Sequence, residues 1–208
     1  MERLIKGYQE FRADGYAHQK ELYEELGLHG QHPDIMLIGC ADSRVDPTDI
    51  FHAYPGQMFV ARNVANLVPP DDLGDDYCCT MAAVQYAVSV IGVNMIVIMG
   101  HESCGGIKGC IDGLGRQPDG GYVNKWLSQI NHVHDRLAGK GVSDDRMVLE
   151  MELESIRQSI KNLLTYDFIR ERVESGDLIL QGAYFSIVKA ELKLSDDAGN
   201  FNLVEPHV

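Results

Sequence analysis

The chain has 208 residues, of which 45% are hydrophobic and 24% are charged, as is ordinary for a globular protein. Its formal net charge of −13 argues against a nucleic-acid partner, because nucleic-acid binding requires a basic surface. No segment reaches the roughly 20 apolar residues of a membrane span, and the N-terminal stretch lacks the apolar core of a signal peptide, so we expect a cytoplasmic protein without membrane contact.

The first expected elements are a helical arm and two strands. Residues 2–26 predict an amphipathic helix with a break near Gly15. Its apolar residues recur on common faces at Leu4, Tyr8, Phe11, Leu22 and Leu26. Two apolar stretches, 34–39 and 57–63, predict short buried strands.

The second half of the chain alternates helices and strands. A helix is expected over 76–92, with Gly92 at its C-terminal end and its packing positions at Ala83, Tyr86, Ala87 and Val90. Residues 94–100 are apolar throughout, as in a parallel strand that is covered on both faces. The remaining expected elements are helices over 123–137, 144–164 and 168–174, a strand over 177–185 and a hairpin over 190–205.

This order predicts an α/β fold with a central, mainly parallel β-sheet flanked by helices, an N-terminal helical arm and a C-terminal antiparallel hairpin. The chain contains no repeat and no linker, so we expect a single domain over 1–208, with the arm at 1–30 and the α/β core at 31–208. Ligands of such sheets bind beyond the carboxyl ends of the parallel strands, which directs attention to the strand ends.

Candidate metal ligands follow two of these strands. Cys40 follows the first strand, and "GHESCGG" places His101 and Cys104 at the end of the third. Five cysteines are an odd number in a chain without an export signal, which favours metal-binding, catalytic or buried thiols over disulfides. Each motif alone is weak, because a single cysteine after a strand is more often a buried small residue. Together they form a Cys₂His set, which suits zinc and leaves a fourth position open.

Three motifs carry a resemblance to a known family. "CADSRVDP", "FVARNVANLVPP" and "HESCGG" occur in an order and at a spacing that closely resemble the β-class carbonic anhydrases, strongly from about residue 30 to 112 and more loosely to residue 194. The resemblance implies reversible hydration of carbon dioxide to bicarbonate and a proton, through attack by zinc-bound hydroxide. It implies one Zn²⁺ per chain, held by Cys40, His101 and Cys104.

The resemblance also assigns Asp42 and Arg44 to an orienting and gating pair. Two thiolates neutralise Zn²⁺ formally, so the bound water ionises less readily than at a site of three histidines. A carboxylate at Asp42 would orient that water and receive its proton, while Arg44 would hold Asp42 ionised and away from the zinc. Asp46, beside Pro47, is expected to be only a turn or cap residue.

The substrate pocket and the assembly also follow from the resemblance. Val64, Ala65 and Tyr86 match family positions at the carbon dioxide pocket, and Gly105 is expected beside them. Core packing is an equally good interpretation of Tyr86. The family pocket is completed across a dimer interface to which the arm contributes, which implies a homodimer or a tetramer of dimers.

A subset of the family has a noncatalytic bicarbonate site built from a Trp, an Arg and a Tyr. Here Leu37 stands at the Trp position and Phe185 at the Tyr position, and only Arg62 matches. An alignment shifted by one residue would place Tyr184 there instead. We therefore predict that the chain resembles the members that lack this site, and that Asp42 stays off the zinc near neutral pH.

Other polar residues are expected to be structural. Burial is the expected fate of Cys78, Cys79 and Cys110, and a surface position that of His132 and His134. Two other functions are compatible with the motifs: a zinc hydrolase of carbonyl sulfide or carbon disulfide on the same scaffold, and a nonenzymatic zinc-stabilised protein. A closed structural zinc site would require a fourth Cys or His ligand, and the motifs offer Asp42 with Arg44 instead.

Overall fold

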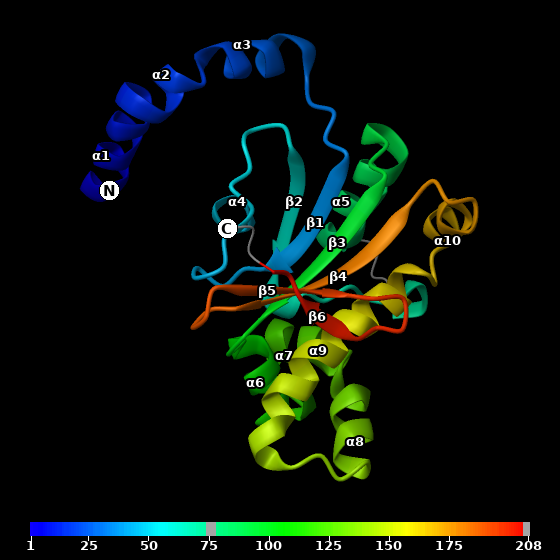
Figure 1. Ribbon diagram of the computed structural model, residues 1–208. Coiled ribbons are helices and arrows are strands. Elements are labelled where there is room, and N and C mark those ends of the chain that lie inside the picture. The colour runs from blue at the N-terminus through cyan, green and yellow to red at the C-terminus, as the bar shows by residue number, and fades with distance from the viewer. Residues whose placement is uncertain (74–77, 206–208) are drawn as a thin grey trace.

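A six-stranded sheet forms the centre of the protein, for which a computed structural model describes residues 1–73 and 78–205. The strand order is β2-β1-β3-β4-β5-β6 (Figure 1). The parallel strands are β1 (Ile35–Cys40), β2 (Met58–Asn63), β3 (Met95–His101) and β4 (Ile179–Ser186). An antiparallel extension follows, formed by β5 (Glu191–Ser195) and β6 (Phe201–Leu203). The predicted fold class is confirmed.

Helices cover the sheet and its carboxyl end. They are α4 (Pro47–Ile50), α5 (Cys79–Gln85), α6 (Gly105–Ile111), α7 (Gly121–Ser128), α8 (Asn131–Gly139), α9 (Asp144–Leu163) and α10 (Asp167–Glu174). Short 3₁₀ turns lie at Val64–Asn66, Asp71–Leu73 and Leu114–Arg116. The helix predicted over 123–137 is two helices, because the chain turns where the Ile130 N–H donates to the Leu127 carbonyl. Within the described residues, no helix is long and apolar enough to cross a membrane.

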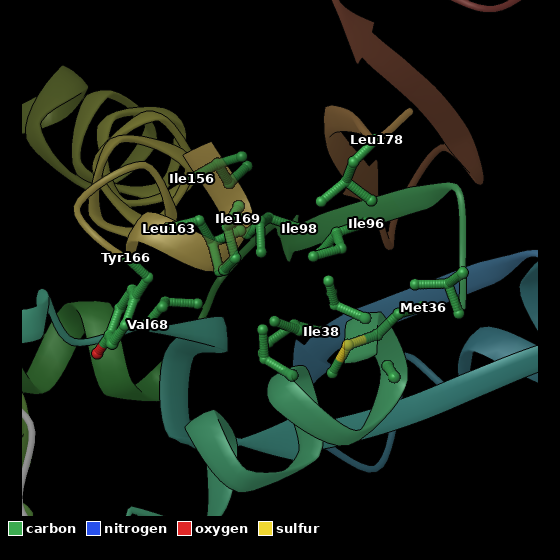
Figure 2. Packing of buried hydrophobic residues seen from close by; sticks show 14 of the residues in the cluster. Met36, Ile38, Val68, Ile96, Ile98, Ile156, Leu163, Tyr166, Ile169 and Leu178 are labelled. Atoms are coloured by element: carbon green, nitrogen blue, oxygen red, sulfur yellow. The ribbon is translucent and has the colours of Figure 1, made fainter. Parts of the chain in front are cut away.

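The two faces of the sheet bury alternate side chains of β1. Met36 and Ile38 point into a cluster packed by α5, α9 and α10, which Figure 2 shows together with Ile96 and Ile98 of β3. Leu37 belongs to a separate cluster on the opposite face. Burial on both sides explains why the strand is apolar at every position.

The helix that contains Tyr86 differs from its prediction. Its start at 76–77 lies outside the described residues, and after α5 it continues as a π-helical turn over Tyr86–Ile91. Gly92 ends it in a left-handed conformation, as expected. Tyr86 is 49% exposed and Val90 is 66% exposed, so the predicted packing face was wrong at these two positions. The buried stripe is instead Val84, Ala87 and Val88, which recur at helical spacing on the face next to Ala83.

The N-terminal arm extends away from the sheet (Figure 1). It contains α1 (Glu2–Glu10), a π-helical turn over Phe11–Gly15, α2 (Tyr16–His18) and α3 (Lys20–His29). None of residues 1–30 is buried. The break predicted near Gly15 lies at Gln19 instead, where φ is −120°, whereas Gly15 keeps a helical φ of −56°.

Candidate zinc site

Two neighbouring strands bring the predicted metal ligands together. β1 and β3 pair in parallel, and they end at Cys40 and His101. Cys104 follows three residues later, at the start of α6. The ligand atoms of these three residues all lie within 4.8 Å of one another, and the three residues are buried. The convergence predicted from the strand ends is therefore confirmed.

The three donors have the chemistry and spacing of a zinc site. The sulfurs of Cys40 and Cys104 are 3.9 Å apart, and two thiolates on one tetrahedral zinc lie about 3.8 Å apart when each Zn–S bond is about 2.3 Å. His101 Nδ1 lies 2.9 Å from the carbonyl oxygen of Glu102, which can only accept, so Nδ1 carries the proton. The buried Nε2 therefore has a free lone pair, and no side chain or backbone group of residues 1–73 and 78–205 forms a hydrogen bond with it.

The two thiols titrate as a pair. The hydrogen bond with Cys104 lowers the pKa of Cys40, and backbone N–H groups, including those of Asp42 and Ala65, lower it further against the effect of burial. The same contact with Cys40, together with burial, raises the pKa of Cys104. Zinc binds cysteine as the thiolate, so metal binding would release the protons that these sulfurs carry in the metal-free protein.

Asp42 and Arg44 form a two-bond fork beside the ligands. Arg44 Nε donates to Asp42 Oδ1 at 2.9 Å, and Arg44 Nη2 donates to Oδ2 at 2.8 Å. The hydrogen bonds from Arg44 hold the pKa of the Asp42 carboxyl well below its ordinary value. Arg44 Nη2 also donates to the Ser103 carbonyl at 3.1 Å, so the fork joins the two loops that supply the metal ligands.

Arg62 of β2 fastens the loop between Cys40 and Asp46. Its guanidinium donates to the carbonyl oxygens of Cys40 at 2.9 Å and Asp42 at 2.7 Å, and to the Asp46 carboxylate at 2.9 Å. Asp46 also caps α4 by accepting from the Thr48 N–H, as expected for a cap residue. Its ion pair with Arg62 was not predicted, because it depends on the β1–β2 register that sets Gly39 beside Arg62.

The predicted pocket residues occupy two separate places. Ala65 is fully buried, and its backbone N–H reaches the Cys40 sulfur from a left-handed turn with φ of 65°. The neighbouring Val64 is 40% exposed. A Cβ atom on Gly106 would lie 2.9 Å from both side chains, so the glycine lets this turn approach α6. Gly105 opens α6, and a Cβ atom there would meet nothing within 4 Å.

Tyr86 lies apart from the ligands of its own chain. Its ring centroid is 5.9 Å from that of Phe59, whose partner on β1 is Met36. Met36 precedes Cys40 by four residues, about 13 Å along a strand. The structure therefore groups Val64, Ala65 and Gly105 with the three ligands and places Tyr86 elsewhere on the surface.

Sequence reasoning missed Glu152, a buried acid behind the metal ligands. One carboxyl oxygen of Glu152 accepts the Cys104 N–H at 3.0 Å, and the other accepts the Tyr184 hydroxyl at 2.9 Å. Burial raises the pKa of this carboxyl. The helical periodicity of the sequence could have indicated it. Glu152 lies four residues after Val148 and four before Ile156, on the apolar and mostly buried face of α9.

The remaining cysteines and histidines lie outside the site. Cys110 is buried as predicted, but Cys79 is exposed and Cys78 is half-buried. The prediction was wrong for Cys79 because α5 begins there, and both residues line an open groove of about 580 Å³. His132 is exposed and His134 is half-buried, with its Nδ1 3.5 Å from the Asp135 carboxylate.

Comparisons with known proteins identify the family to which this fold and site belong. The carbonic anhydrase family matches residues 35–192. A carbonic anhydrase of Synechocystis sp. is 36% identical over 203 residues, which cover 94% of this chain and 71% of that protein. Beta carbonic anhydrase 6, mitochondrial, of Arabidopsis thaliana is 34% identical over 207 residues, which cover 97% and 70%.

Solved structures agree with these matches. The β-carbonic anhydrase CcaA is 33% identical, with a TM-score of 0.90 over 100% of this chain and 93% of that chain. A tetrameric β-carbonic anhydrase of Sordaria macrospora is 29% identical, with a TM-score of 0.80 over 93% and 95%.

The fold and the Cys₂His site are those of the β class, and the chain belongs to the carbonic anhydrase family. It is a carbonate dehydratase that hydrates carbon dioxide to bicarbonate, with Cys40, His101 and Cys104 as its zinc site.

Proposed function

We propose that Asp42 orients the attacking water and accepts its proton, while Arg44 keeps Asp42 ionised and away from the zinc. The observation that carries this proposal is the fork, in which Arg44 engages both oxygens of Asp42. Among the described residues only three Cys, His or acidic side chains converge, which leaves the fourth tetrahedral position to water. When bound, zinc lowers the pKa of that water so that it attacks carbon dioxide near neutral pH.

The side chains around the zinc divide the remaining work. Two thiolate ligands make the metal a weaker Lewis acid. Backbone N–H groups that donate hydrogen bonds to the Cys40 sulfur reduce the negative charge that this ligand passes to the metal. Asp42 supplies the acceptor that the water proton needs. Val64 and Ala65 offer an apolar wall, and the open space at Gly105 admits a molecule as small as carbon dioxide.

Stopped-flow hydration of carbon dioxide, with zinc content measured on the same samples, tests these roles. Asp42→Asn is expected to lower kcat about 100-fold or more and to keep one zinc per chain, because the ligands are intact. Asp49→Asn changes an exposed acid of the neighbouring helix α4 and serves as the matched control. An Asp42→Asn enzyme with wild-type kcat would refute the role of Asp42.

A second pair of variants ties activity to the metal. Cys104→Ser is expected to lose both zinc and activity, because it removes one of three ligands. Cys110→Ser alters an equally buried thiol whose sulfur faces Asn131, so it should keep both. Equal zinc loss in the two variants would point to general destabilisation instead.

We also propose that the chain forms a homodimer, alone or as half of a tetramer, with the arm of each subunit against its partner. Leu4 is 71% exposed, Ile5 51% and Tyr8 62%, which is unusual for one contiguous apolar face. Tyr86 and Val90 add exposed apolar surface outside the arm. In the dimer we place Tyr86 against the partner's substrate pocket, which accounts for its distance from its own zinc ligands.

Finally, we propose that this enzyme lacks the noncatalytic bicarbonate site. Leu37 pairs with Val60 and Gly39 with Arg62, so Leu37 and Arg62 lie on the same sheet face. Phe185 follows Ala183, which packs with Leu37, by two residues and so lies on this face as well.

Tyr184 does not restore the missing donor. It points to the other face, where its hydroxyl donates to Glu152. The Arg62 guanidinium is also engaged already by Asp46 and by backbone carbonyls. The face with Leu37 and Phe185 therefore offers bicarbonate no free hydroxyl or indole donor from these positions.

A further inference from the structure

A buried carboxyl group lies directly behind the zinc ligands and has no role in the reaction described above. Glu152 of α9 is 2% exposed. Both of its oxygens accept hydrogen bonds from neutral groups, the Cys104 backbone N–H at 3.0 Å and the Tyr184 hydroxyl at 2.9 Å. Within residues 1–73 and 78–205, no Lys or Arg forms an ion pair with it. Burial of a carboxyl without a cation is costly, so packing alone is a poor reason for an acid here.

The Cys104 N–H belongs to the turn that presents the metal ligands. Ser103, the preceding residue, has a left-handed φ of 57°, so the turn departs from regular structure just before the sulfur ligand. At the φ of −67° that Cys104 adopts, the direction of its N–H sets the direction of its Cα–Cβ bond. A group that holds this N–H therefore also limits where the Sγ atom points.

The same helix holds the other end of the turn. Ile156, one helical turn after Glu152, packs so closely on Gly100 that a Cβ atom there would lie 2.7 Å from Ile156 Cδ1. Gly100 directly precedes His101, and Tyr184 is its partner in the β3–β4 register. Helix α9 thus contacts the ligand turn before His101 and at Cys104.

We infer that Glu152 is a positioning residue of the zinc site: it orients the Cys104 thiolate through the Cys104 N–H, and Tyr184 fixes the carboxyl group for this purpose. Loss of such an outer partner typically weakens metal binding about 10- to 100-fold. The inference concerns how the chain holds zinc and does not depend on the roles of Asp42 and Arg44.

Two substitutions separate reach from charge. Glu152→Asp keeps the carboxyl group but shortens the side chain by one methylene, so it no longer reaches the Cys104 N–H. Glu152→Gln keeps the length and an acceptor oxygen but carries no charge. We expect the zinc dissociation constant, measured by competition with a chromogenic chelator, to rise about tenfold or more in Glu152→Asp and to stay within about threefold of wild type in Glu152→Gln.

The spectrum of the cobalt-substituted protein gives a readout that loss of stability alone does not move. The thiolate-to-cobalt charge-transfer band is expected to shift in Glu152→Asp and to keep its position in Glu152→Gln. Leu163→Val, a core change at the far end of the same helix without a bond to Cys104, is the matched control and should keep both the band and the zinc constant.

Two results would overturn the inference. One is wild-type zinc affinity and band position in Glu152→Asp. The other is a loss in Glu152→Gln as large as that in Glu152→Asp, which would show that the position of the acceptor alone does not hold the zinc. If Glu152→Asp does not fold, Tyr184→Phe decides the question. Removal of its hydroxyl releases one side of the carboxyl group, so a shifted cobalt band supports the inference and an unchanged band contradicts it.

Discussion

Arg62 Nη1 lies 2.9 Å from Asp46 Oδ2, and the same guanidinium donates to the carbonyl oxygens of Cys40 and Asp42. One cation from β2 therefore closes the loop that carries the first zinc ligand and the proposed proton acceptor. The fork of five N–H donors makes this possible, because no other side chain can serve three acceptors in one plane. The rigidity of Asp42 thus depends on a strand that contributes no metal ligand.

Replacement of Arg62 should destabilise this loop. Arg62→Ala leaves the Cys40 and Asp42 carbonyls without their donor. We expect the free energy of unfolding in urea to fall by about 2 kcal/mol. The ion pair with Asp46 contributes little of this, because solvent screens the half-buried carboxylate. Arg62→Lys should recover only part of this, because an ammonium lacks the fork. Arg170→Ala, which breaks a surface pair with Asp167, is the control and should cost at most about 0.5 kcal/mol. Equal losses of unfolding free energy in Arg62→Ala and Arg170→Ala would contradict a special role of Arg62 in closing this loop.

The arm makes a prediction about assembly. A variant with Leu4→Asp and Tyr8→Asp places two charges on the exposed apolar face of α1, so we expect it to sediment as a monomer if that face packs against a partner. If Tyr86 reaches the partner's pocket as proposed, carbon dioxide hydration should fall in the same variant. Lys6→Gln changes an exposed charge on the same helix and should leave the assembly intact. A double variant that sediments like the wild type would show that the arm does not hold the subunits together.

The strands and the zinc ligands followed from the sequence because each depends on local information. A strand buried on both faces is apolar at every position, which located β1 and β3 to within one residue. Parallel strands end at a common edge, which brought Cys40 and His101 together. The expected domain boundaries and the cytoplasmic location stay predictions.

The unpredicted features depend on how distant elements dock. Arg62 contacts Asp46 because of the β1–β2 register. Glu152 contacts Cys104 because α9 packs against β3, although the two residues are 48 positions apart in the sequence. Neither contact can be predicted from the local sequence pattern around the residues that make it. The exposure of Cys79 depends likewise on the residue at which α5 begins.

Acid should remove the contribution of Glu154. Burial alone would raise the pKa of this carboxyl, but hydrogen bonds and charges from Arg157 and Arg136 outweigh burial and lower it. The folded protein then binds fewer protons than the unfolded chain, so the stabilisation is present above the ordinary pKa of about 4.3 and is lost as the pH falls below that value.

We therefore expect Glu154→Gln to lower the free energy of unfolding by about 1 kcal/mol at neutral pH and by progressively less in acid. Urea unfolding across this range measures the difference. Glu171→Gln, an exposed acid on α10, should show no such trend. A Glu154→Gln penalty that stays constant into acid would mean that packing, rather than charge, provides the stabilisation.

The proposed lack of a noncatalytic bicarbonate site makes a kinetic prediction. With Leu37 and Phe185 in place of hydrogen-bond donors and with Arg62 engaged by Asp46, added bicarbonate should slow carbon dioxide hydration only as a product that competes at the zinc. The initial rate should therefore fall hyperbolically with bicarbonate concentration near neutral pH, and Phe185→Leu should leave the shape of this curve unchanged. A sigmoidal fall would indicate a second site, as would a crystal structure near neutral pH with Asp42 bound to zinc in place of its fork with Arg44.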